Sequence, residues 1–272
     1  MRRRHTLLIG FGLGALTVIF AAAVANRGAL LAPNNAAGTS AASPSPTPQP
    51  GPTLIPSATG PGPRAGAVLV YDPENRGVIL FGGSHTVPHA DGTNELVSTG
   101  DTWLWDGKAW RRFEVPGPPA RSSAMATYDS KRRVVVLFGG GGPTGTGPAL
   151  LLNDTWAWDG STWTKQAGEP PAASGWTYLT YDSATRQIVG FVYFGLDNHE
   201  PAGYTLTWDG VQWTDRTNAS QPSPRADAGI AYDEATGQVV LYGGSFDQPQ
   251  PFSETWVGDG STWSLWSPAA GA

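Results

Sequence analysis

Three arginines occupy matching places in the sequence and could form an anion-binding site. Arg64, Arg121 and Arg225 each precede, by seven residues, the tyrosine of a Tyr-Asp pair. A guanidinium group binds a carboxylate or phosphate through two parallel hydrogen bonds. Three such groups that converge at the mouth of a central channel could clamp an anionic ligand. The same spacing fits a structural role, in which each arginine bonds carbonyl groups or an acid of the neighbouring repeat. Repetition favours the structural role.

A second group of residues has the chemistry of a metal site. His85, His89 and Asp91 share the polar stretch "SHTVPHADGTNELVST". Imidazoles four residues apart beside a carboxylate can bind a divalent metal. Pro88 lies between the two histidines, and a flexible loop holds metal ligands poorly. A solvated polar loop is therefore the preferred interpretation, and we predict no metal and no cofactor.

Two further candidates for ligand binding belong to a less regular part of the chain. Trp176 offers an indole on which a sugar could stack, although packing explains it equally, and His199 lies in the stretch "LDNHEPAGY". Binding residues are often found on loops that a rigid scaffold positions. We expect the ligand on the rim formed by loops 84–100, 143–153, 196–203 and 245–253.

Composition excludes several classes of function. The 272 residues contain no cysteine, which removes disulfides, thiolate metal sites and cysteine-derived cofactors. The formal net charge is −5 and there is no basic block beyond the N-terminus, so we expect no nucleic-acid partner. The 36 glycines and 24 prolines are typical of a turn-rich β protein.

A fourfold repeat supplies the elements that must position these residues. "DTWLWDGKAW", "NDTWAWDGSTW", "TLTWDGVQW" and "ETWVGDGSTW" recur with their Asp-Gly pairs 53, 50 and 50 residues apart. Asp-Gly favours a two-residue hairpin turn, which would place Trp156 opposite Trp163. Before each hairpin lie a strand ending in Tyr-Asp and an apolar strand such as "VVVLFGG". Each repeat thus predicts four antiparallel strands, with the tryptophans packed between repeats.

These repeats resemble the kelch repeats of bacterial, galactose-oxidase-like proteins. The resemblance rests on the Gly-Gly pair after an apolar strand, the Asp-x-Trp motif and the later Trp, and covers residues 63 to 266. It implies an all-β fold, a β-propeller of four four-stranded blades at about 63–116, 117–169, 170–221 and 222–266. A closed ring, an open array and closure by a second chain all fit. We favour closure, by one chain or with a second chain, because open sheet edges promote aggregation.

The N-terminus is a separate region. "MRRRH" precedes the uncharged stretch 7–25, so residues 1–27 are expected to form a hydrophobic helix that is a cleaved signal peptide or a membrane anchor. Residues 28–62 are rich in proline and read as a disordered linker, with the apolar stretch "TLIP" as a segment that could dock on the propeller at 63–272. Either alternative predicts an extracytoplasmic protein that meets the membrane only through this segment.

The sequence favours an exported, non-catalytic module that binds a protein or a carbohydrate through its loop rim. The alternative is a small enzyme, resembling a sialidase-like hydrolase or a mutarotase, that acts on a sugar through the arginines. A purely structural display module is the third possibility. No catalytic residues are identified, because spacing in the sequence does not reveal a triad or an acid pair.

Overall fold

The computed structural model describes residues 53–57, 59–142, 150–168, 170, 176–194, 202–246 and 250–267. Within these residues the protein is all-β and contains no helix. In that part of the chain no helix is long and apolar enough to cross a membrane. The predicted N-terminal helix at 1–27 lies outside the described residues, as does most of the predicted linker.

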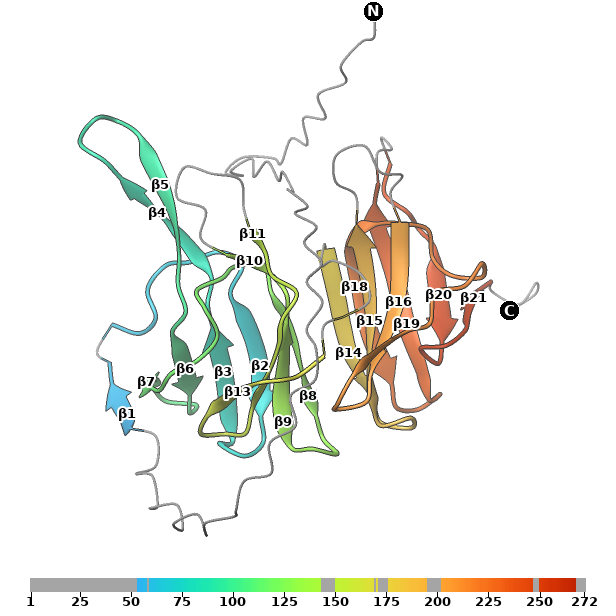
Figure 1. Ribbon diagram of the computed structural model, residues 1–272, viewed down its shortest axis with the longest axis horizontal. Helices are drawn as coiled ribbons and strands as arrows, with labels where there is room; N and C mark the ends of the chain where they lie inside the picture. Colours follow the sequence, from blue (N-terminus) through green and yellow to red (C-terminus); the bar gives the residue numbers. More distant parts are fainter. Residues whose placement is uncertain are drawn as a thin grey trace, which may run out of the picture.

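Four antiparallel sheets, here called units 1 to 4, repeat along the chain, and each contains four strands in sequence order, as predicted (Figure 1). Unit 1 comprises β2 (Val68–Asp72), β3 (Gly77–Phe81), β6 (Thr102–Trp105) and β7 (Trp110–Glu114). Unit 2 comprises β8 (Met125–Asp129), β9 (Val134–Phe138), β12 (Thr155–Trp158) and β13 (Trp163–Lys165). Unit 3 comprises β14 (Trp176–Asp182), β15 (Gln187–Phe194), β16 (Ala202–Trp208) and β17 (Trp213–Asp215). Unit 4 comprises β18 (Ala226–Asp233), β19 (Gln238–Ser245), β20 (Thr255–Gly258) and β21 (Trp263–Leu265).

Three additions extend this pattern. The apolar stretch at Thr53–Pro56 forms β1, which pairs with β7 and gives unit 1 a fifth strand. It therefore docks on the repeats as we expected. A hairpin of β4 (Ser84–Pro88) and β5 (Asn94–Ser98) rises from unit 1, where the sequence suggested a loop (Figure 1). Unit 2 carries a shorter ribbon of β10 (Gly141–Gly142) and β11 (Leu150–Leu151).

The tryptophan hairpins have a different register from the one predicted. Trp158, not Trp156, lies opposite Trp163, and the turn contains four residues closed by a bond from the Asp159 N–H to the Thr162 carbonyl. A type I′ turn requires positive φ at both central residues, whereas only Gly160 has it here. The Asp159 carboxylate instead accepts the N–H groups two and three residues later, which stabilises the longer turn.

Because of the aspartates at the hairpin turns, we expect the stability of the fold to fall at low pH. Hydrogen bonds from the Ala109 N–H, the Arg111 guanidinium and the Lys108 N–H lower the pKa of Asp106 from 3.8 to about 2. Because the folded pKa is the lower one, this contribution to stability is present above the unfolded pKa. It is lost as pH falls from about 4 to about 2. We expect the thermal midpoint to drop over that range, with a shallower drop in Asp106→Asn. A midpoint that stays constant in a fluorescence-monitored melt would contradict this.

The four units follow one another in an open arc. The innermost strands contact each other in the order β2, β8, β14 and β18, and the described residues show no contact of similar extent between β18 and β2. Closure of a ring by one chain alone, one of the alternatives from the sequence, is therefore wrong for this structure, because the sheets do not close. We call the side of a unit that packs on the preceding unit its leading face, and the opposite side its trailing face.

Three apolar clusters join successive units, as the tryptophan repeat predicted. The first packs Phe81 and Phe113 on the trailing face of unit 1 against Trp158 and Trp163 on the leading face of unit 2. The Phe81 and Trp163 rings lie 5.3 Å apart, and those of Phe113 and Trp158 lie 4.8 Å apart. Buried aromatics of this kind dominate packing energetics, so the indoles belong to the scaffold.

A hydrogen bond recurs at each of these junctions. The Nε1–H of Trp163 donates to Thr102 Oγ1 of the preceding unit over 2.9 Å. The same bond links Trp213 to Thr155 and Trp263 to Thr205, at 2.8 and 2.9 Å. Each unit therefore presents an indole donor on its leading face and a threonine acceptor toward the next unit. This satisfies buried polar groups that would otherwise destabilise the junction.

Candidate functional site

The three predicted ligand arginines lie within their own units and are bonded there. Arg121 donates to Asp154 and to the carbonyl oxygens of Gly139 and Pro119, each 3.0 Å away, and its side chain is 0% exposed. Partial burial acts to raise the pKa of Asp154, but hydrogen bonds from Arg121 and Trp156 outweigh it and lower that pKa. The same arrangement holds for the other two arginines. Arg64 pairs with Asp101 at 2.6 Å, and Arg225 pairs with Glu254 at 2.9 Å.

The acid also accepts from a tryptophan, which makes a triad of Arg, acid and Trp in units 1, 2 and 4. The Trp156 Nε1–H donates to Asp154 Oδ2 over 2.7 Å, and Trp103 and Trp256 make the matching bonds to Asp101 and Glu254. In the sequence of unit 3 the corresponding residues are Ser174, Tyr204 and Leu206. All three members of the triad are replaced together, which supports the structural role of the arginines.

The structure does not bring the three arginines together around a ligand. Their donors are directed to partners in separate units, and an anion would have to displace the half-buried carboxylate of Asp154 to reach Arg121. Isolated charges are costly to bury without a partner, so such an exchange is unfavourable. Anion binding by these arginines remains a prediction, while their contacts within the fold are established.

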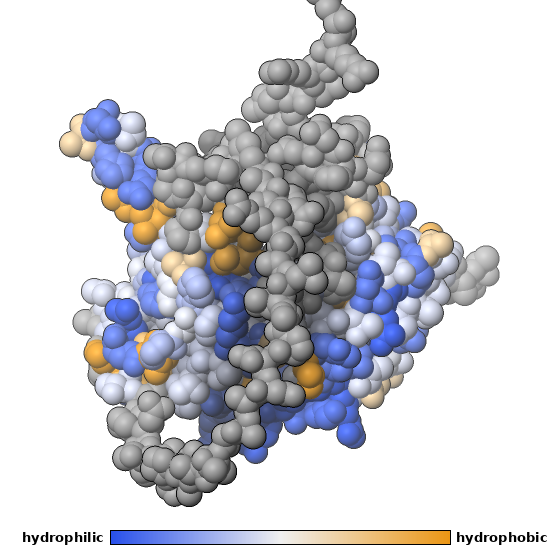
Figure 2. All heavy atoms as spheres, viewed as in Figure 1, coloured by the Kyte–Doolittle hydropathy of each residue, from blue (hydrophilic) through white to orange (hydrophobic). Residues whose placement is uncertain are grey.

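The weak metal candidates lie on the β4–β5 hairpin. His85 is in β4, His89 and Asp91 are near the tip, and His89 Nε2 lies 3.2 Å from Glu95 Oε2. Asp91 instead accepts hydrogen bonds from Thr93, which lower its pKa. Figure 2 shows that the hairpin is largely hydrophilic toward its tip and apolar at its base. Among the described residues, no three acidic or histidine side chains are placed to hold a metal ion.

Much of the predicted rim cannot be compared with the structure. His199 and the side chain of Trp176 lie outside the described residues. Of the four rim loops, the hairpin at 84–98 is described in full, and the others only in part. The rim therefore stays a prediction.

A shallow, open concave surface lies at the Tyr-Asp ends of the innermost strands, where units 2, 3 and 4 meet. It is a groove of about 460 Å³, which is within the range of known ligand sites. Residues from β8, β14 and β18 and the turns that follow them line it: Thr127, Tyr128, Ser130, Thr180, Tyr181, Ile230, Ala231, Tyr232 and Glu234. We call this site the axial groove. Its walls combine three tyrosines with aliphatic hydroxyls and one carboxylate.

The aspartate after each tyrosine fixes the backbone of this groove. Asp129 and Asp182 are 0% and 1% exposed, so their carboxylates are buried beneath the turns. Asp182 accepts the N–H of Ala184 over 2.9 Å, and Asp233 accepts that of Ala235 over 2.9 Å. These aspartates therefore start the turns that follow the innermost strands. The tyrosines are thus carried on a pre-organised backbone, which lowers the entropy cost of binding.

Hydroxyl groups in the axial groove are already partly engaged. Tyr128 donates to Glu74 Oε1 over 3.2 Å, and burial together with that carboxylate raises the pKa of Tyr128. Tyr181 Oη accepts the Lys131 N–H over 3.3 Å. Glu234 accepts from Ser183 over 2.7 Å. Because each hydroxyl can both donate and accept, capacity remains for a polar ligand without a formal charge.

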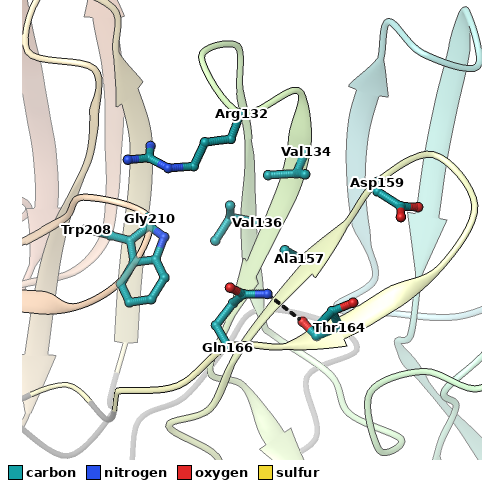
Figure 3. Close-up of a pocket in the computed structure, with 9 residues that line it drawn as sticks. All are labelled: Arg132, Val134, Val136, Ala157, Asp159, Thr164, Gln166, Trp208 and Gly210. Carbon is teal, nitrogen blue, oxygen red and sulfur yellow. Dashed lines mark hydrogen bonds between the residues drawn. The ribbon is translucent and has the colours of Figure 1, made fainter. Parts of the chain in front are cut away.

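A smaller hollow of about 240 Å³ lies at the junction of units 2 and 3 (Figure 3). In this figure Arg132 extends toward Trp208 and Gly210, while Gln166 folds back to donate to the Thr164 carbonyl over 3.0 Å. At the first junction the corresponding space is filled by Phe113, which packs on Trp158. The hollow is therefore a packing gap that a smaller polar residue leaves.

Sequence reasoning missed the tyrosines as site residues, and it wrongly placed the acid partners of the arginines in the neighbouring repeat, whereas each acid lies in the arginine's own unit. The Tyr-Asp pairs were interpreted only as strand ends, although their repetition places one tyrosine at the same point of every innermost strand. The acids were visible as the Asp or Glu two residues before the hairpin tryptophan in three of the four repeats. Both signals required the spatial order of the strands.

Comparison with known proteins supports the fold. No protein-family model matches the chain, and no curated protein matches its sequence. The structure resembles that of YjhT with a TM-score of 0.51 and 13% identity, over 70% of this chain and 61% of YjhT. The chain thus spans about three fifths of the length of that protein. An N-acetylgalactosamine deacetylase from F. plautii, in complex with blood group B trisaccharide, has a TM-score of 0.41 at 13% identity, covering 78% and 74% of the two chains. These likenesses concern the fold alone, and the second is too weak to carry an argument.

Proposed function

We propose that this chain is an exported, kelch-like β-propeller module that binds an uncharged part of a glycan in the axial groove without transforming it. The observation that carries the proposal is the convergence of Tyr128, Tyr181 and Tyr232 on a groove of about 460 Å³. The apolar N-terminal stretch and the proline-rich segment after it support export.

The chemistry of the groove suits a sugar. A pyranose ring presents apolar C–H faces and polar hydroxyl edges, and a tyrosine presents an apolar ring with a polar end. The threonine and serine hydroxyls beside the tyrosines can donate or accept as the sugar requires. Among the described residues, the lining contains one carboxylate and no arginine or lysine, so a neutral sugar matches it better than an anionic sugar.

Glycan-array screening followed by calorimetry with the best oligosaccharide tests this proposal. We expect the variant Tyr181→Phe/Tyr232→Phe to bind about tenfold more weakly or worse, because two hydrogen bonds of about 0.5–1.5 kcal/mol each are lost. Tyr71→Phe is the matched control: Tyr71 has the same repeat position but does not line the groove.

Two results would contradict the proposal. One is that no glycan on the array binds, in which case a protein ligand at the rim becomes the better hypothesis. The other is that the bound oligosaccharide changes in mass or anomeric form during incubation, which would favour the sugar-acting enzyme. The arginines, which suggested that enzyme, are occupied by contacts within their own units.

A further inference from the structure

The trailing face of unit 4 exposes positions that are buried elsewhere in the repeat. Tyr242 is 57% exposed, whereas Phe81, Phe138 and Phe191 at the same position of units 1 to 3 are 1%, 1% and 0% exposed. In those units the phenylalanine lies in the cluster that joins its unit to the next one. The aromatic ring of unit 4 therefore lacks the indole that covers its equivalents.

The outermost strand of unit 4 likewise ends next to an aromatic residue that is exposed, although its equivalent in unit 1 is buried. Trp266 is 55% exposed, whereas Phe113, at the same position of unit 1, is 3% exposed. Thr255 is half-buried and makes no side-chain hydrogen bond among the described residues. Its equivalents Thr102 and Thr155 each accept an indole N–H from the following unit. Unit 4 thus presents an unused acceptor beside two exposed aromatic rings.

The leading face of unit 1 carries the groups that would match those on unit 4, namely exposed apolar side chains and an indole donor. Leu69 and Tyr71 at its inner edge are 60% and 57% exposed, although Leu80 and Trp103 farther out on the face are buried. Trp110 is half-buried, and its Nε1–H has no partner among the described residues. Its equivalents in units 2, 3 and 4 all donate to a threonine of the preceding unit.

We propose that a second copy of this chain docks the leading face of its unit 1 on the trailing face of unit 4, and that two chains close into one ring with two identical junctions. The bond expected at each junction joins the Trp110 indole of one copy to Thr255 of the other. The argument is repetition: this junction is already formed three times within the chain, and the open arc leaves one half of it at each end. Large apolar side chains that are exposed where their repeat equivalents are buried are candidates for an interaction surface. The proposal does not depend on glycan binding.

Sedimentation velocity of the full-length protein in a mild detergent tests the proposal, with the detergent contribution subtracted. We expect the wild-type chain to sediment with twice the mass of one copy. Tyr242→Lys and Leu69→Lys should each weaken the dimer at least tenfold, because each places a charge in both junctions. Val211→Lys is the matched control, since Val211 is 72% exposed on the hairpin turn of unit 3 and belongs to neither face.

The proposal is overturned if the wild-type chain is monomeric at micromolar concentrations, or if its dimer survives both lysine variants. Circular dichroism establishes that the variants are folded, which is expected because both substituted side chains are exposed in the single chain. A glycan that still binds to a monomeric variant would leave the proposed function intact, so the two proposals fail separately.

Discussion

Replacing Arg121 with methionine is expected to lower the free energy of unfolding by about 3–5 kcal/mol, because the change leaves the partner carboxylate uncompensated. The Arg121 side chain is 0% exposed and bridges β9 to the start of β12 through the Gly139 carbonyl and Asp154. Methionine fills much of the volume but donates no hydrogen bond. Urea denaturation followed by tryptophan fluorescence measures the difference.

Arg111→Met is the control for this experiment. Arg111 pairs with Asp106 at 2.8 Å, but the two side chains are 44% and 25% exposed. Solvent screens such a pair, so the expected loss is much smaller than that of Arg121→Met. If Arg121→Met were as mild as Arg111→Met, the structural role of the buried arginines would be wrong. Their assignment to ligand binding would then regain support.

The second large effect is expected from Trp158→Ala, which should cost about 3–5 kcal/mol by the loss of a buried indole. Trp158 is 0% exposed and lies within 4.8 Å of Phe113 and 5.4 Å of Trp163, measured between ring centroids. Its Nε1–H also donates to Asp72 of unit 1 over 3.1 Å. The substitution therefore disrupts the junction of units 1 and 2 as well as the hairpin.

Trp105→Ala separates these two contributions in a parallel chemical denaturation, with both variants measured at concentrations where the chain is monomeric. Trp105 has the same position in unit 1 and packs on Trp110 at 5.6 Å, but no unit precedes it in the described chain. It is half-buried, and we expect a loss of about 1–2 kcal/mol. Equal losses in the two variants would mean that the hairpin pair, and not the junction between units, is the main source of stability.

Local chemistry made the architecture of each unit predictable. Alternating apolar strands, Gly-Gly ends and Tyr-Asp turns act over a few residues, so the number of units and the strand order could be derived from the pattern. The register of the tryptophan hairpin could not be derived from the pattern, because Asp159-Gly160 is compatible with turns of two or four residues. The choice depends on the carboxylate accepting two N–H groups, as at Ser161 and Thr162.

Features that depend on the contacts between units, or between distant strands of one unit, could not be predicted from the sequence. The arginines looked like a converging set because their spacing is regular, yet each one bonds an acid more than 25 residues later in its own unit. The axial groove joins tyrosines about 50 residues apart, and its existence depends on the curvature of the arc. The curvature of the arc depends on how the side chains pack at the junctions between units. The repeat motifs do not specify this packing.

The open arc also determines how the molecule comes apart. Units 2 and 3 each share two junctions, whereas units 1 and 4 share one each. A linear array of this kind is held by nearest-neighbour couplings, so partial unfolding begins at its termini and spreads inward. Joining the termini across a second copy would remove every free end, and loss of structure would then become a single cooperative event.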